Sequence, residues 1–142
     1  MAALTSHDHS AYLEITLTHV EEDIGSTMIL GVHVACTTEH RVRLNDRLTI
    51  TKSDVHRLTE MLKAVSRNKG EAISFVNFTD GLIIDVDWRL RDYYRLSEDT
   101  ISLTISIGFP LTYTVCCKMV AYISDVEAFA RQLDGELASL AS

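Results

Sequence analysis

The sequence is poor in the motifs that mark a catalytic or cofactor-binding site. Its six glycines are scattered, so it contains neither a phosphate-binding glycine loop nor a dinucleotide fingerprint. It has no GxSxG nucleophile elbow and no HExxH zinc motif. It also lacks an apolar run of the roughly 18 residues that a membrane-spanning helix needs. We therefore expect a protein that is not an enzyme and has no cofactor, no bound metal and no membrane segment.

Cysteine is scarce as well. The three cysteines, Cys36, Cys116 and Cys117, show no CxxC spacing, and their odd count does not suggest a disulfide framework. Adjacent residues of a strand point to opposite faces, so Cys116 and Cys117 are poorly placed to share a metal ion. The pattern indicates buried thiols in a reducing compartment, and we expect a cytoplasmic protein.

The composition that remains is that of an acidic globular domain. The chain has 142 residues, 46% of them hydrophobic, and a net charge of −7. This length is typical of a single domain, so we expect residues 11–142 to form one α+β domain and residues 1–10 to be frayed. An acidic protein is a poor match for nucleic acids and anionic membranes and a good match for a basic protein partner.

Alternation of apolar and polar residues predicts several β-strands. The alternation runs through residues 13–17, 28–36, 73–78, 82–88, 101–107 and 111–119. A further short strand is expected within residues 41–50, broken by the turn-prone pair Asn45-Asp46. Short connections such as Thr79-Asp80-Gly81, a hairpin signal, favour an antiparallel meander.

Two amphipathic helices complete the pattern. The first begins at Thr51 or Ser53, buries a stripe that includes Leu58 and Leu62, and ends at residues 68–70. The second opens with a capping box at residues 124–127, and Gly135 either ends it early or weakens it. The elements predict an α+β fold in which both helices pack on one face of a largely antiparallel, curved meander sheet, as a two-layer sandwich.

Asp85 and Asp87, with the aromatic segment that follows them, form the candidate site. The two carboxylates share one strand face, because residues two apart point the same way. The segment adds tyrosine and arginine, which are enriched at protein interfaces. The pair is interpreted as a solvated face, a partner-binding acidic patch, or a metal-holding or catalytic pair. The predicted partner-binding residues are Asp85, Asp87, Arg91, Asp92, Tyr93, Tyr94, Glu98 and Asp99.

The histidines offer few sets of metal ligands. His7-Asp8-His9 is the most metal-like cluster, but it falls in the N-terminal segment expected to be frayed, without a further ligand nearby. His19 and His33 fall on strands that could be neighbours. We expect satisfied or solvent-facing histidines rather than a general base.

Three segments occur in a distinctive order along the chain. They are residues 53–58 with Met61-Leu62, the strand at residues 81–88, and residues 126–129 with Leu133. This layout resembles that of small bacterial immunity proteins of polymorphic and wall-associated toxin systems, in which a helix precedes a strand pair and a closing helix follows the last strand. The resemblance implies a protein that binds a cognate toxin in the cytosol of the producing cell and occludes its active site.

We therefore expect a protein-binding module, in its sharpest form an immunity protein that inhibits a bacterial toxin. Its partner would be the toxin or another protein, and an exposed sheet edge would also allow a homodimer. The alternative is a small-molecule-binding protein or an enzyme with a pocket between the curved sheet and the helices. A pocket that holds His33 or the Asp85–Asp87 pair would favour this alternative.

Overall fold

The computed structural model describes residues 1–19, 28–67, 73–77, 81–87, 99–108 and 115–141. Within these ranges the strands form two four-stranded antiparallel sheets, in the orders β1-β2-β3-β4 and β5-β6-β7-β8. The predicted α+β class, with antiparallel pairing and two long helices, is confirmed. The structure adds that the strands divide between two sheets instead of forming one curved sheet.

The first sheet consists of β1 (Ala2–Thr5), β2 (Ala11–His19), β3 (Ile29–Thr38) and β4 (Arg41–Thr51). β1 corrects the prediction of a frayed N-terminus. It pairs with β2 along its whole length, and the side chains of Ala2 and Leu4 are almost fully buried. Two apolar residues in strand alternation are enough to hold a terminus when a sheet edge and a helix are there to receive them.

The prediction that β4 breaks at Asn45-Asp46 is wrong. Both residues pair in register with β3, opposite Ala35 and Val34, and their side chains are exposed. Exposure explains the error, because an edge strand tolerates polar residues that would be costly inside a sheet. The irregularity lies earlier, where the register shifts between Cys36 and Thr37.

The second sheet consists of β5 (Ile73–Asn77), β6 (Leu82–Asp87), β7 (Thr100–Ile107) and β8 (Val115–Tyr122). The predicted hairpin between β5 and β6 is confirmed by their antiparallel pairing. Thr79 and Asp80 of the predicted turn lie outside the described residues, whereas Gly81 has a φ of +74°, and a Cβ atom there would lie 2.9 Å from the carbonyl oxygen of Gly108. Both the backbone angle and the close approach require glycine at this position.

The helices are α1 (Lys52–Lys63), which a 3-10 turn at Val65–Arg67 follows, and α3 (Ile123–Ala141). The Thr51 hydroxyl caps α1 by accepting a hydrogen bond of 3.1 Å from the Asp54 amide, as predicted. α1 ends at Lys63, earlier than residues 68–70, because Ala64 already closes its last turn. α3 continues through Gly135, since Leu137 beyond it is buried in the core.

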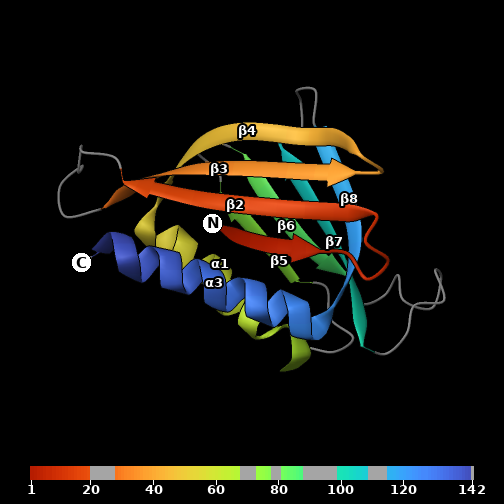
Figure 1. Ribbon diagram of the computed structural model, residues 1–142. Helices are drawn as coiled ribbons and strands as arrows, with labels where there is room; N and C mark the ends of the chain where they lie inside the picture. The colour runs from red at the N-terminus through yellow and green to blue at the C-terminus, as the bar shows by residue number, and fades with distance from the viewer. Residues whose placement is uncertain (20–27, 68–72, 78–80, 88–98, 109–114, 142) are drawn as a thin grey trace.

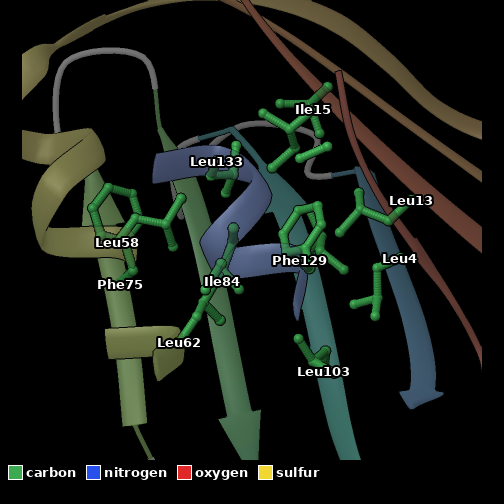
Figure 2. Close-up of a cluster of buried hydrophobic side chains, with 14 of the residues drawn as sticks. Leu4, Leu13, Ile15, Leu58, Leu62, Phe75, Ile84, Leu103, Phe129 and Leu133 are labelled. Atoms are coloured by element: carbon green, nitrogen blue, oxygen red, sulfur yellow. The ribbon is translucent and has the colours of Figure 1, made fainter. Parts of the chain in front are cut away.

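The two sheets cross steeply, and the helices lie side by side at the open side of the crossing (Figure 1). The inner faces of both sheets and the apolar stripes of both helices form a single core. Figure 2 shows Phe129 and Leu133 of α3 packed among side chains of both sheets and α1. Both described helices therefore pack on the inner faces of the sheets.

Hydrogen-bonding groups from other parts of the chain cap three of the sheet edges. On β1, the Ala3 amide donates to the Gln132 side chain of α3. On β5, the Arg57 guanidinium of α1 donates to the Val76 carbonyl, and on β8 the His7 amide donates to the Val120 carbonyl. β4, in contrast, is exposed at Arg41–Arg43, Asn45–Arg47 and Thr49. β4 also contacts β8, and a homodimer contact through a sheet edge stays a prediction.

Cys36 of β3 and Cys117 of β8 form a disulfide that joins the two sheets. Both residues are buried, whereas Cys116 points the other way and is exposed. The expectation of three buried thiols is therefore wrong. The pair was hidden because 81 residues separate the two cysteines and the crossing of the sheets alone brings them together. Disulfides are rare in a reducing cytosol, so the cytoplasmic location stays a prediction.

Candidate functional site

The outer face of the second sheet carries the predicted carboxylates. Asp85 and Asp87 lie on the same face of β6 and are half-buried. The residues that alternate with them, Ile84 and Val86, are buried on the opposite face. Hydroxyl side chains of the neighbouring strands surround them in register. We call this surface the acidic face and define it as Ser74, Asp85, Asp87, Ser102 and Thr104.

Within the acidic face, Asp85 is held in place by its neighbour. The Ser74 hydroxyl of β5 donates a hydrogen bond to the Asp85 carboxylate across the strand pair. Thr104 of β7 lies opposite Asp85 on the other side. Because α1 and α3 pack against the inner faces, the carboxylates of this strand point away from the core. The arrangement can present fixed negative charge and hydrogen-bonding groups to a partner.

Of the other six predicted partner-binding residues, Asp99 is the one that the structure describes. Arg91, Asp92, Tyr93, Tyr94 and Glu98 lie outside the described residues. Asp99 is exposed, and its carbonyl oxygen accepts a hydrogen bond of 2.8 Å from the Ile123 amide at the start of α3. The structure thus brings Asp85 and Asp87 together and places Asp99 at the junction between β7 and α3.

The histidines on neighbouring strands do not form a shared site. His33 of β3 lies opposite Thr16 of β2, while His19 lies opposite Leu30. The His33 Nε2 atom lies 2.5 Å from the Asn45 side-chain oxygen of β4, so this ring is hydrogen-bonded. Among the residues that the structure describes, no group of three or more histidine, cysteine or acidic side chains could hold a metal ion.

The segment His7-Asp8-His9 belongs to the turn between β1 and β2 and is anchored on both sides. Its His7 amide donates to the Val120 carbonyl of β8 at 2.8 Å, and the His7 Nδ1 atom lies 3.1 Å from the same oxygen. The turn between β3 and β4 lies beside it, where the Glu39 amide donates to the Ser10 carbonyl at 2.8 Å. These residues were expected in a frayed N-terminal segment, and the contacts of His7 with Val120 correct that expectation.

Both turns contain residues in the left-handed backbone region. His9 has a φ of 62°, Glu39 of 51° and His40 of 65°. Such angles are uncommon for residues other than glycine and cost of the order of 1–3 kcal/mol each, so the surrounding contacts must impose them. Their concentration in two adjacent turns marks this corner as a place where shape is maintained at some cost in stability.

Between these turns and β7–β8 lies a pocket of about 330 Å³, which we call the junction pocket. It is lined by His7, Asp8, Ser10, Ala11, Thr38, Glu39, Ser102, Lys118, Met119 and Val120. Its place differs from the one expected for a small-molecule site, between the sheet and the helices. That space is filled by buried side chains such as Leu58, Leu62 and Phe129.

Asp8 is a strongly perturbed carboxylate in the lining of this pocket. Its Oδ1 atom accepts hydrogen bonds from the Ser10 hydroxyl at 2.6 Å, the Ser6 hydroxyl at 2.9 Å and the Ser10 amide at 3.1 Å. These bonds, with the Ser10 hydroxyl first, hold the pKa of the Asp8 carboxyl well below its usual range. Asp8 therefore stays negatively charged in the junction pocket.

Two smaller hollows lie elsewhere on the surface. One, of about 210 Å³, lies on the outer face of the first sheet around Gly31, His33 and Arg47. The other, of about 280 Å³, lies beside the helices between Arg67 and Arg131. The first contains His33, but the hydrogen bond from its ring to Asn45 gives it a structural role. Nor does any helix within the described ranges have the length and apolar character to cross a membrane.

Comparisons with known proteins give distant likenesses. No family model and no curated protein matches the sequence. Among solved structures, the chain is similar to the plant transcriptional regulator PBF-2, at 7% identity over 98% of this chain and 80% of that one, with a TM-score of 0.49. It is also similar to MRP1/MRP2 of Trypanosoma bruciei, at 11% identity over 92% and 86%, with a TM-score of 0.42. Nothing about the function of this chain is taken from these likenesses.

Proposed function

We propose that this protein binds another protein through the acidic face, and that the partner is a bacterial toxin whose active site it occludes. The observation that carries the proposal is the pair of outward-facing carboxylates, Asp85 and Asp87, on a sheet face that no core helix packs against. The proposal gives these residues a role in binding rather than in catalysis, so it needs neither a cofactor nor a metal.

The charge of the chain supports a basic partner. A net charge of −7 attracts a positively charged surface from a distance and raises the rate of encounter. Fixed carboxylates then select the partner, because a wrong partner with like charge at that place is repelled. A toxin that acts on nucleic acid needs a basic site, and covering this site would inhibit it.

Geometry adds to the electrostatic argument. The Ser74 hydroxyl orients the Asp85 carboxylate, so less side-chain freedom is lost when a partner binds. Asp99 lies exposed near the end of the same sheet and extends the acidic character toward α3. A surface prepared in this way is suited to a tight, stoichiometric inhibitor.

The proposal predicts that charge reversal on the acidic face abolishes protection. The protein is co-expressed with the product of the gene next to its own, which is expected to be a toxin, and growth of the host is measured. We expect Asp85→Lys with Asp87→Lys to weaken binding of the purified toxin domain by about a hundredfold or more, since two ion pairs become repulsions. Growth protection should be lost in parallel.

A matched control carries two reversals on exposed carboxylates elsewhere. Asp46→Lys with Glu60→Lys changes the net charge from −7 to −3, as the test pair does, because each reversal adds two charges. This variant should bind and protect almost as well as the wild type. Equal loss in both variants would reduce the effect to net charge, and unchanged binding in the test pair would contradict the proposed surface.

A further inference from the structure

The junction pocket contains a serine hydroxyl group that forms no hydrogen bond with the described residues. Ser102 of β7 is 6% exposed and lines the pocket. Its hydroxyl makes no hydrogen bond within the described part of the chain. The Ser102 oxygen atom itself is accessible from the pocket. Ser102 therefore offers a hydrogen-bond donor and acceptor to a molecule in the pocket.

Side chains of opposite charge line different parts of the junction pocket. The turns contribute two carboxylates, Asp8 and Glu39, while β8 contributes the ammonium group of Lys118. The three hydrogen bonds to Asp8 all go to Oδ1, so its Oδ2 atom receives none of them. Lys118 forms no ion pair with any residue that the structure describes. The pocket thus separates a fixed negative group from a positive one.

Size and lining restrict what fits. A volume of about 330 Å³ lies at the lower end of the range for sites that bind small organic molecules. Ala11, Met119 and Val120 supply apolar surface between the polar groups. The hydrogen bonds that tie both turns to each other and to β8 keep the walls in place before a ligand arrives.

From these features we propose that the junction pocket binds a small zwitterion, an α-amino acid or a close analogue. The ammonium group of the ligand would pair with Asp8 Oδ2 and Glu39, and its carboxylate would accept from Lys118 and the Ser102 hydroxyl. The ligand side chain would lie against Met119 and Val120. This site is distinct from the toxin-binding role proposed above, although Ser102 belongs to both the junction pocket and the acidic face.

The test is a titration of the wild-type protein with each standard amino acid at millimolar concentration, followed by amide chemical shifts. We expect at least one amino acid to shift amides of the two turns, Ser102 and residues 118–120, and to leave the helices unchanged. At about ten times Kd it should also raise Tm by about 4 °C. The matched deaminated acid and decarboxylated amine should not bind, because each lacks one of the two charges.

Variants separate the pocket from the rest of the sheet. Ser102→Ala, Asp8→Asn and Lys118→Met should each weaken binding of that amino acid about tenfold or more. Ser106→Ala is the matched control, since Ser106 lies on the same strand and the same face but outside the pocket. Asp8→Asn keeps an oxygen for the turn, so it should still fold, and its amide spectrum checks this.

Several outcomes would overturn the proposal. One is that no amino acid shifts the pocket amides, and another is that the deaminated acid or the amine binds as tightly as the amino acid. A third is that Ser106→Ala weakens binding as much as Ser102→Ala. Failure of the toxin proposal is recognised separately, since the Asp85 and Asp87 variants are read out by toxin binding and the pocket variants by amino-acid binding.

Discussion

At the scale of single residues, Asp8 shows how a short polar turn can be stabilised by one carboxylate. Three hydrogen bonds to one oxygen atom add to the backbone hydrogen bonds of the turn. Because the folded state favours the charged form, the pKa of Asp8 is lower in the folded than in the unfolded chain. The stabilisation is present above the unfolded value of about 3.9 and is lost as pH falls toward the folded value.

The lowered pKa of Asp8 in the folded state gives a prediction for the pH dependence of stability in Asp8→Asn. At neutral pH the variant should be less stable than the wild type, and the difference should shrink below about pH 4, where the wild-type carboxylate begins to lose its advantage. Urea midpoints at pH 7 and at about pH 3 measure it. Ser10→Ala, which removes the 2.6 Å donor, should show a weaker pH dependence than the wild type. An equal difference at both pH values would refute the argument.

At the scale of elements, α3 tolerates a glycine that it does not need. Gly135 is exposed in the helix interior, and a Cβ atom there would meet nothing within 4 Å. The residues on either side of it in the packed stripe, Leu133 and Leu137, are both buried. Packing therefore holds the last turns of α3 despite the weak helix propensity of glycine.

Gly135→Ala should accordingly stabilise the protein by about 0.5–1 kcal/mol, because alanine loses less backbone freedom on folding than glycine. Chemical denaturation of both proteins tests this. Gly81→Ala is the informative counterpart, since its φ of +74° and the 2.9 Å approach to Gly108 make the same substitution destabilising. If both variants moved stability in the same direction, the distinction between the two glycines would be wrong.

Much of the element structure could be predicted from local sequence. Alternation located most strands, and the Thr51 cap and the apolar stripe located α1. The failures have a common cause, which is that tertiary contacts decided the result. β1 is held by β2 and α3, the Asn45-Asp46 segment by pairing with β3, and the last turns of α3 by burial of Leu137. No window of neighbouring residues contains those contacts.

The same limit applied to the candidate site. Strand periodicity was sufficient to place Asp85 and Asp87 on one face, because that relation is local. The junction pocket was not predictable, since it joins two turns to strands more than sixty residues away in the chain. Asp8 was noticed for its neighbouring histidines, whereas Ser102 gave no signal in the sequence at all. A serine on a strand becomes a candidate binding residue when the structure places it in a pocket lining.

At the scale of the whole molecule, one covalent bond ties the two sheets together. Reduction of Cys36–Cys117 should lower the free energy of unfolding by about 2–4 kcal/mol, since the bond restricts a long segment of the unfolded chain. Denaturation with and without dithiothreitol measures the loss. Cys116→Ser should respond to the reductant as the wild type does, because Cys116 is exposed and free. A reductant-insensitive wild type would argue against the bond.

The disulfide also divides the chain into a closed ring and two tails. Residues between Cys36 and Cys117 belong to the ring, while β1 with β2 and α3 lie on opposite tails. The two tails nevertheless pack against each other, as β1 contacts α3. A backbone cut inside the ring consequently leaves a single covalent molecule, whereas a cut in either tail frees a piece that non-covalent packing alone retains. Proteolysis in either tail can therefore release a fragment, whereas proteolysis between Cys36 and Cys117 cannot while the disulfide is intact.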